Sequence, residues 1–418
     1  AKQHCIVPGV ALTAEQAASL TSDMVWLVKD VVMVEGKPVE VIYPKVYLKQ
    51  SDRLQLHTDG TLISANTLVM NAKKRIHNEG VIQGKTVVLA SDQDIINSGH
   101  INADKVGLQS DTIIYQQGQI VGRDAVGLQA KENITFNNSI EHLTNQDVLH
   151  KTAGIAVTGD TGVMIVSAGN DVNLGGATIE ALGKEGAITI TAGRDINSTT
   201  DTLTGKKDMT QDGDNYLRTY RQTELGTTIE AGGDISIGAK HDIKARNLTV
   251  SSDSGAVKVI GEHDVSIENG YSDSKDVFAL KYKEKGLLNK KETKIKTNDE
   301  SKNALMSTLS GHTVVVGANN DVTLTSSNIV STAGTSVLAG HNVITDAAAE
   351  HTLSTAYKDV KKSGIMGAGM GIMIGKKQSK DNYYIDETTH KATTLGSTDG
   401  EVTVQAGETV HLNNTNAV

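Results

Sequence analysis

The chain has 418 residues, a length that exceeds one ordinary globular core and predicts either several domains or an array of repeats. Aromatic residues make up only 3%, while glycine occurs 41 times and proline three times, a composition that favours many short strands over a helical bundle. The net charge of −9 gives no basic footprint for nucleic acid, and the single cysteine, Cys5, excludes an internal disulfide and a cysteine-based zinc cluster.

Residues 1–50 are predicted to form a small α+β cap or connector. Thr13 and Gln16 have the spacing of a capping box at the start of a short helix, within LTAEQAASL at residues 12–20. Residues 23–48 are interpreted as two strands around Glu35-Gly36. Because the open end of a repeat array exposes its apolar interior, such a segment is suited to cap the repeats that follow.

Residues 51–418 are predicted to form a β-solenoid. Similar positions recur every 19 or 20 residues at Val69, Val88, Gly107 and Gly127. Farther along, apolar alternation followed by Ala-Gly-x-Asp recurs, as in VMIVSAGNDVNL and AITITAGRDIN. Alternation with period two predicts half-buried strands, and units this short bury their apolar face only by stacking. The sequence therefore predicts an all-β, right-handed parallel β-helix.

The aspartates at the repeat corners are predicted to be structural. The corner glycine is expected to supply a positive φ, and the acid that follows it to hydrogen-bond the backbone of its own turn. Calcium held between stacked aspartates is the alternative, but the nonapeptide calcium repeat is absent from the sequence. The residues assigned this turn-structural role are Asp171, Asp195, Asp234, Asp264 and Asp321.

Three insertions lengthen the interval between corners, and they are predicted to leave the stack as hairpins at about 200–226, 271–310 and 346–398. The second is rich in lysine and places Phe278, Leu280 and Tyr282 on one face of a strand. This pattern suggests contact with anionic lipid or lipopolysaccharide. The alternative is a solvated edge hairpin whose lysines block aggregation.

The third insertion contains SGIMGAGMGIMIGKK, residues 363–377. A phosphate-binding loop is excluded because Met370 stands where glycine is required, and the uncharged run is too short for a membrane helix. With period two it predicts one strand with an apolar face, which either meets a membrane or packs on the solenoid flank. The predicted membrane-contact residues of the last two hairpins are Ile365, Met366, Met370, Ile372, Met373, Ile374, Phe278, Leu280 and Tyr282.

The leading segment LTAEQAASLTSDMVWLV, the Ala-Gly-x-Asp coils and the form STAYKDVKKSGIMGAGMGIMIGKK resemble haemagglutinin-type exoproteins of two-partner secretion. The chain is most similar to the second haemagglutinin-repeat region, with its preceding short domain, of contact-dependent growth inhibition effectors and filamentous haemagglutinins. The resemblance implies an excised piece of a secreted, cell-surface protein that has a periplasmic stage, an outer-membrane secretion partner and contacts with flanking regions of the same polypeptide. It also implies a role in moving a C-terminal toxin across a target cell's outer membrane.

No catalytic constellation is predicted. The sequence contains neither His-Glu-x-x-His nor Gly-x-Ser-x-Gly, and no pair of carboxylates is identified across coils. We therefore expect a non-enzymatic protein with no cofactor, no metal and no nucleic-acid partner. The preferred function is a β-helical segment that associates with a target outer membrane and helps to translocate a toxin. The alternative is a passive adhesin or filament rod that presents loops to a cell-surface partner.

Overall fold

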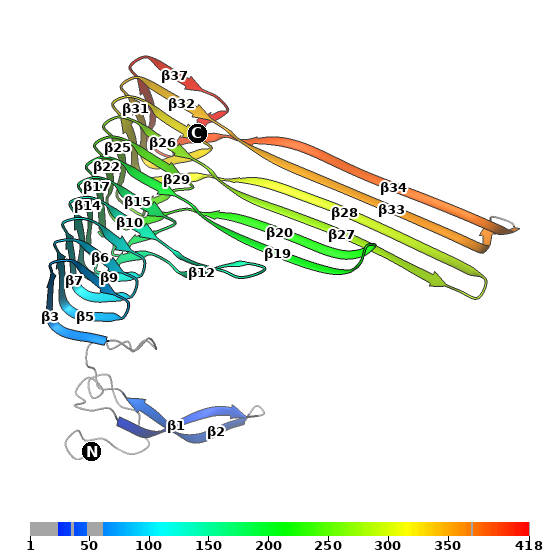
Figure 1. Ribbon diagram of the computed structural model, residues 1–418, viewed down its shortest axis with the longest axis horizontal. Coiled ribbons are helices and arrows are strands. Elements are labelled where there is room, and N and C mark those ends of the chain that lie inside the picture. Colours follow the sequence, from blue (N-terminus) through cyan, green and yellow to red (C-terminus); the bar gives the residue numbers. More distant parts are fainter. Residues whose placement is uncertain (1–23, 35–36, 48–61, 369–370, 418) are drawn as a thin grey trace. The chain divides into compact units, whose positions relative to one another are not determined.

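The computed structural model describes residues 24–34, 37–47, 62–368 and 371–417, and the structural statements below concern these ranges. The chain divides into two units, Ala1–Gly60 and Thr61–Val418. Every regular element in the described ranges is a β-strand (Figure 1). These ranges contain no helix that is long and apolar enough to cross a bilayer.

The first unit contains an antiparallel hairpin of β1 (Met24–Val34) and β2 (Lys37–Tyr47). Pairing runs from Met24 opposite Tyr47 to Val34 opposite Lys37, so both strands expected within residues 23–48 are present. The helix predicted for residues 12–20, with Thr13 and Gln16, lies outside the described residues. The described part of this unit is therefore β-structure alone, without the helical half of the predicted cap.

The second unit is built on stacked parallel coils, as predicted (Figure 1). One face is an eleven-stranded parallel sheet to which each coil gives one short strand. Neighbouring coils pair in register, as where Val172 lies opposite Ile196. In chain order these strands are β4 (Arg75–Asn78), β6 (Asp94–Asn97), β8 (Ile114–Gln116), β10 (Ile134–Asn137), β15 (Val172–Gly175), β18 (Ile196–Thr199), β23 (Ile243–Arg246), β26 (Val265–Glu268), β30 (Val322–Thr325), β32 (Asn342–Asp346) and β37 (Thr409–Leu412).

The remaining strands of the coils form the other faces, which long strands join at a corner. The first half of β9 pairs with β13 and its second half with β14, so one long strand belongs to two faces. The long strands are β3 (Leu62–Ala72), β5 (Val81–Ser91), β7 (His100–Ser110), β9 (Gln119–Ala130), β29 (Ser307–Ala318) and β31 (Ser327–Ala339). The short ones are β13 (Gly154–Val157), β14 (Val163–Ala168), β16 (Thr178–Ala181), β17 (Ala187–Ala192), β21 (Thr228–Ala231), β22 (Ile235–Ala239), β24 (Thr249–Ser252), β25 (Ala256–Gly261), β35 (Thr393–Ser397), β36 (Glu401–Ala406) and β38 (Thr415–Ala417).

The core is a set of aliphatic columns that run along the stack. Because alternate residues point inward, each coil places the same kind of side chain over its neighbour. One column consists of Leu89, Leu108, Leu128, Val166 and Ile190, paired from coil to coil and all at most 2% exposed. Full burial of each such side chain contributes about 1.5–3 kcal/mol, so stacking supplies the stability that a single coil lacks. The prediction of an all-β solenoid is confirmed, and its right-handed winding stays a prediction.

Another column of inward side chains begins with three buried amides that are hydrogen-bonded to one another. Asn78 donates to Asn97 Oδ1 at 2.8 Å, and Asn97 donates to Gln116 Oε1 at 3.0 Å. Gln116 in turn donates to the carbonyl oxygens of Gly118 and Gly154. Phe136 and then Leu174 continue the column in the next coils. Each amide is satisfied by its neighbour, which removes the cost of burying an unpaired polar group.

The corner glycines do not have the positive φ that the sequence suggested. Neither Gly169 nor Gly193 adopts one, and equivalent corners carry Lys240, Glu262 and Asn319 without a left-handed backbone. Glycine at the tight corners instead allows neighbouring coils to approach closely, because a Cβ on Gly193 would overlap the carbonyl oxygen of Gly169 in the preceding coil. The prediction that these glycines supply a positive φ is therefore wrong. Close packing between coils explains them instead.

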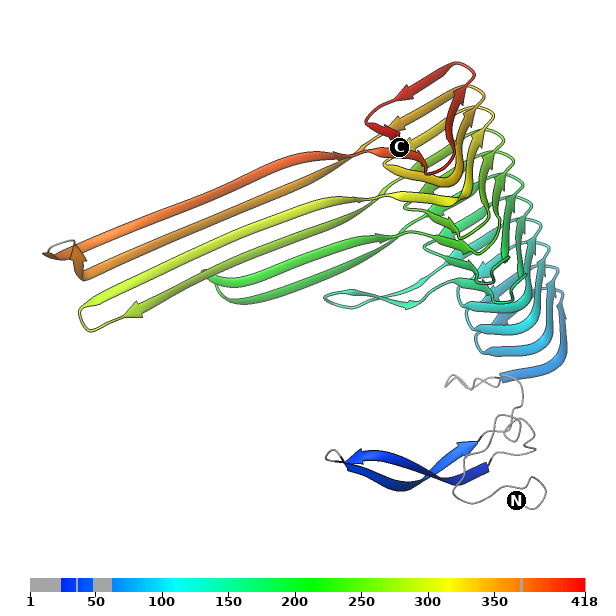
Figure 2. The ribbon, with the colours of Figure 1, turned by 180° about the vertical axis from the view of Figure 1, so that it is seen from behind.

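Three long hairpins leave the same side of the solenoid and lie side by side (Figures 1 and 2). They form one six-stranded antiparallel sheet, the hairpin sheet, in the order β19-β20-β27-β28-β33-β34. A fourth, shorter hairpin, β11 (Ser139–His142) and β12 (Asp147–Lys151), was not predicted. The bounds of the long strands are β19 (Asp201–Asp212), β20 (Asn215–Leu225), β27 (Gly270–Lys285), β28 (Asn289–Leu305), β33 (Ala348–Ala368) and β34 (Gly371–Lys391).

The fourth hairpin lies against β19, the first edge strand of the hairpin sheet. Asp147 accepts hydrogen bonds from the Thr204 hydroxyl at 2.6 Å and the Thr204 amide at 2.8 Å. These bonds, with one from His142, lower the pKa of Asp147 to about 2. An exposed edge strand is a template for unwanted pairing with other chains. The contact with the fourth hairpin covers part of β19 and so protects this edge of the hairpin sheet.

Candidate functional site

One face of the hairpin sheet carries apolar side chains. Opposite residues in an antiparallel pair share a face, and no bulge interrupts the pairing of β20, β27 and β28. Leu217 lies opposite Phe278, and Leu280 lies opposite Ile295. Phe278 and Leu280 are half-buried and Tyr282 is exposed, so the three residues singled out in the sequence join apolar neighbours from two other strands.

The other face of the hairpin sheet is held by ion pairs. Asp214 accepts hydrogen bonds from Lys281 Nζ at 2.8 Å and Lys294 Nζ at 2.7 Å, and these bonds lower its pKa to about 2. Lys275 and Glu300 pair at 2.8 Å across β27 and β28. Ion pairs occur on the apolar face as well, where Arg221 pairs with Asp276 at 2.7 Å. The same strands therefore combine the features of both interpretations of the second insertion, an apolar contact surface and a solvated hairpin.

The glycine-rich stretch 363–377 is not the single strand that alternation predicted. β33 ends at Ala368, β34 begins at Gly371, and these two residues lie opposite each other, so the chain reverses within the stretch. Both arms keep the same period, which is why alternation alone hid the reversal. Ile374 is 79% exposed and Ile365 is half-buried. Met370 and the side chains of Met366, Ile372 and Met373 lie outside the described residues.

Two leucines that the sequence reasoning missed lie at the neighbouring hairpin tip. Leu287 and Leu288, between β27 and β28, are 100% and 62% exposed. The amide of Ile365 donates to the carbonyl of Leu288 at 3.0 Å, which joins the two tips. Gly364 has φ +116°, and a Cβ there would overlap the Leu288 carbonyl, so this junction requires glycine. The sequence did contain a signal for this tip, namely two adjacent leucines in a turn, where polar residues are usual.

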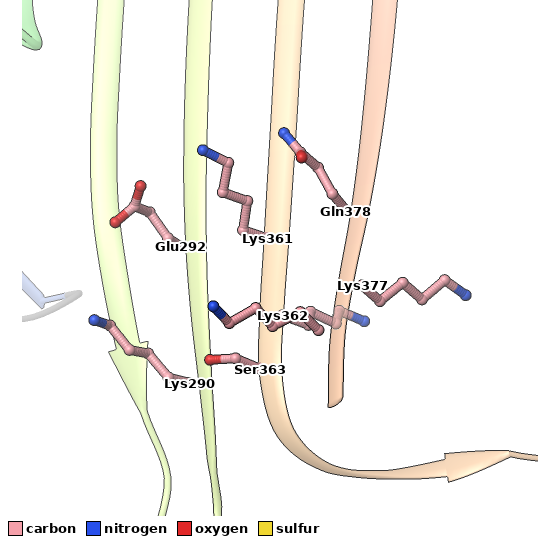
Figure 3. Close-up of a pocket in the computed structure, with 8 residues that line it drawn as sticks. Lys290, Glu292, Lys361, Lys362, Ser363, Lys377 and Gln378 are labelled. Atoms are coloured by element: carbon pink, nitrogen blue, oxygen red, sulfur yellow. The ribbon is translucent and has the colours of Figure 1, made fainter. Parts of the chain in front are cut away.

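A pocket of about 440 Å³ lies beside these tips (Figure 3). Ser363 and Lys376 lie opposite each other on β33 and β34, and Lys290 lies opposite Ser363 on β28. Figure 3 shows the chain turning sharply just beyond Ser363. The lining of this lysine pocket consists of Lys290 and Glu292 of β28, Lys361, Lys362 and Ser363 of β33, and Lys376, Lys377 and Gln378 of β34.

The tips and the lysine pocket belong to a basic region. We define the distal end as residues 281–296 and 358–380, which contain thirteen lysines and three carboxylates in a chain with a net charge of −9. Lys281 and Lys294 share the single negative charge of Asp214, and Lys291 pairs with Glu284 at 2.9 Å. The remaining lysines of these segments are in excess over the carboxylates, so the distal end combines exposed apolar tips with positive charge.

The corner aspartates form a hydrogen-bonded ladder along the solenoid. Each of these carboxylates accepts a hydrogen bond from a backbone amide of the following coil, and Asp242 accepts one from Lys244 of its own coil as well. Asp195 Oδ1, for example, accepts from the Asp242 amide at 3.0 Å and lies 2.9 Å from His241 Nδ1. The same arrangement links Asp171 to Arg194 and Asp195, Asp242 to His263 and Asp264, Asp264 to Asn320 and Asp321, and Asp321 to His341 and Asn342.

Asp234 was placed at the wrong corner. It accepts from the Ala256 amide at a different bend of the coil, and Asp242 is the residue in register with Asp195. The Gly233-Asp234 pair matched the expected motif, whereas Asp242 follows Lys240 and His241 with no glycine before it. The insertion 200–226 also shifted the spacing, so the sequence offered the wrong aspartate.

His241, Asp242 and His263 are close enough to raise the question of a metal ion, since their ligand atoms lie within 4.8 Å of one another. The two imidazole rings stack with centroids 4.8 Å apart and an angle of 4° between their planes. A metal ion bound in the plane of one ring would lie outside the plane of the other. As they stand, these side chains suit hydrogen bonds between coils better than coordination of one ion.

Because of this ladder, we expect the free energy of unfolding to fall as the pH rises above neutrality. The hydrogen bond with Asp242, with help from the charge on Asp264, raises the pKa of His263. A group whose pKa is raised on folding stabilises the protein below its unfolded value of about 6.5, and that contribution disappears as pH rises through the folded pKa. The midpoint of urea unfolding, followed by circular dichroism, is expected to decrease between about pH 6 and pH 8.5.

The matched variant for this prediction is His263→Gln, which should show a flatter profile over the same range. A profile parallel to that of the unmodified protein would contradict it. At low pH the sign reverses. Burial raises the pKa of Asp242, but hydrogen bonds from Lys244 and His263 outweigh it and leave that pKa at about 2, so its stabilisation disappears as pH falls from about 4 towards 2.

Comparison with curated proteins found several relatives. The chain is 28% identical over 309 residues to a tRNA nuclease CdiA of Escherichia coli, which covers 72% of this chain and 9% of that protein. A tRNA nuclease CdiA of another Escherichia coli strain is 34% identical over 141 residues, 33% of this chain and 4% of that protein. A 16S rRNA endonuclease CdiA of Enterobacter cloacae is 29% identical over 192 residues, 45% of this chain and 6% of that protein.

No family model matches the chain, and no solved structure matches it. The chain spans less than a tenth of the length of each of these three relatives. The three matches all fall on proteins of one kind, and they agree with the resemblance carried by the leading segment and the repeated coils. These matches support membership of the chain in the CdiA family of contact-dependent growth inhibition proteins.

Proposed function

We propose that this chain is a non-enzymatic β-helical segment of a secreted, cell-surface CdiA exoprotein, and that its hairpin sheet associates with a target cell's outer membrane and helps a C-terminal toxin to cross it. The observation that carries the proposal is the distal end, where Leu287, Leu288 and Ile374 are exposed among lysines. Apolar side chains enter the acyl boundary of a bilayer while ammonium groups meet anionic headgroups, so this combination suits a membrane surface.

The corner ladder supports the non-enzymatic part of the proposal. A hydrolase on a solenoid requires carboxylates that reach a substrate for acid–base work. The carboxylates of Asp171, Asp195, Asp242, Asp264 and Asp321 instead accept hydrogen bonds from the next coil. We assign the nuclease activities named for the relatives to parts of those proteins beyond this segment.

The proposal predicts that polar tips abolish membrane association. Replacing Leu287, Leu288 and Ile374 by serine removes three apolar side chains whose transfer into a bilayer contributes about 1.5–3 kcal/mol each when complete. The triple variant is expected to lose at least about tenfold in affinity for vesicles that contain outer-membrane lipid. Flotation of the 418-residue chain with such vesicles on a density gradient measures this loss.

Leu182→Ser is the matched control because Leu182, in the solenoid, is 61% exposed, nearly the same as Leu288. It should leave flotation unchanged. Equal flotation of the triple variant and the unmodified chain would refute membrane association through the tips. Saturable, lipid-independent binding to a cell-surface partner would then support the passive adhesin rod instead.

A further inference from the structure

We infer that the lysine pocket binds the phosphate of a lipid headgroup. This inference rests on the proposed membrane association and names the chemical group that the distal end recognises. The pocket draws on β28, β33 and β34, strands that come from two separate insertions. It therefore exists only when the hairpin sheet is assembled.

The first argument is charge. Five of the eight lining side chains are lysines, and Glu292 is the only carboxylate among them. Glu292 already lies 3.4 Å from Lys283, which neutralises part of its charge. Elsewhere in the sheet, lysines such as Lys275 and Lys281 have carboxylate partners. The pocket thus holds a local excess of positive charge.

The second argument is the absence of partners for these lysines in the part of the chain that the structure describes. No ion pair there involves Lys290, Lys362, Lys376 or Lys377. Lys290 of β28 and Lys376 of β34 lie on either side of Ser363 in one row across the sheet, about two strand spacings apart. An anion bound between them would offset the positive charge of both.

The third argument is the kind of donor. Each lysine ammonium has three N–H donors, and the Ser363 hydroxyl adds another in the same row of residues. Gln378 Nε2 donates to Asp359 at 2.8 Å, so its amide group is already used. Two ammonium groups, those of Lys290 and Lys376, in one row with a hydroxyl suit a phosphate, which offers several acceptor oxygens and carries up to two charges.

The fourth argument selects a lipid over a soluble phosphate. Lys290 and Lys376 lie within three residues of Leu288 and Ile374, the exposed apolar tips. In a bilayer, phosphates lie just above the acyl chains, so tips that enter the acyl boundary bring the pocket to phosphate depth. A volume of about 440 Å³ is also within the range of small-molecule sites.

The test compares two double variants of equal charge. Lys290→Gln with Lys376→Gln removes two lysines of the pocket. Lys296→Gln with Lys380→Gln removes two exposed lysines that do not line it, on the same face of the sheet. Vesicles are made of phosphatidylcholine alone or with phosphatidic acid, whose headgroup is a bare phosphate. The pocket variant is expected to lose roughly tenfold more affinity for the phosphatidic acid vesicles than the control.

A second measurement uses no membrane. Isothermal titration with dihexanoyl phosphatidic acid below its micellar concentration should show binding that the pocket variant loses and the control keeps, and inorganic phosphate should bind more weakly. Equal losses in both variants, or phosphate bound as tightly as the lipid, would overturn the inference. Preferential binding of an oligonucleotide would overturn it too. Failure of the proposed function has a separate signature, since the serine tip variant would then float as the unmodified chain does.

Discussion

Replacing Phe136 by alanine is expected to lower the free energy of unfolding of the solenoid by about 3–5 kcal/mol. Phe136 is one of only two phenylalanines in the chain, and its side chain is fully buried on β10. It lies between Gln116 and Leu174, which belong to the coils on either side. The coils are held apart at a fixed spacing by their backbone hydrogen bonds, so they cannot close around the cavity.

Urea unfolding followed by far-ultraviolet circular dichroism measures the effect. Thr135→Ala on the same strand is the control, because Thr135 points away from the core and should change the free energy by less than about 1 kcal/mol. If Phe136→Ala cost no more than this control, the column of stacked inward side chains would not be the source of stability.

Replacing Asn97 by alanine is expected to cost about 2–6 kcal/mol. The substitution takes the acceptor from Asn78 and the donor from Gln116, so two buried amides lose a partner at once. Each buried polar group left unpaired costs about 1–3 kcal/mol. The same urea titration measures the loss.

Asn197→Ala is a closely matched control. Asn197 donates to Asn173 Oδ1 at 3.1 Å in the same eleven-stranded sheet, but this asparagine ladder lies on the outer surface. Water replaces the lost hydrogen bond there, so the cost should stay below about 1 kcal/mol. Equal effects at Asn97 and Asn197 would show that burial does not decide the value of these ladders.

The periodic part of the fold was predictable because the sequence repeats wherever coils pair. Val69, Val88, Gly107 and Gly127, chosen from spacing alone, are mutual partners in the parallel sheet. The wrong choice of Asp234 has the same origin, because it rested on a motif rather than on register. Where an insertion interrupts the count, a motif match has no independent check.

The pairing of the hairpins into one sheet could not be predicted from the sequence. Pairing of β20 with β27 and of β28 with β33 joins separate insertions, and antiparallel contacts of this kind leave no period in the chain. The lysine pocket depends on that pairing, so its residues appeared only as unrelated lysines in two insertions. Phe278, Leu280 and Tyr282 were recognisable because they alternate within one strand, whereas Leu287 and Leu288 lie in a turn with no alternation.

The pairing between hairpins also sets an order of assembly. Neighbouring coils with no hairpin between them join residues 19 to 24 positions apart, such as Val88 with Gly107 and Ile165 with Thr189, whereas pairs between hairpins, such as Tyr216 with Ala279, join residues much farther apart. The longer loops close at less entropic cost once wound coils hold the hairpin bases together. We therefore expect the coils to form before the hairpins pair with one another, and the hairpin sheet to open from its tips while the coils stay intact, as a second cooperative unit.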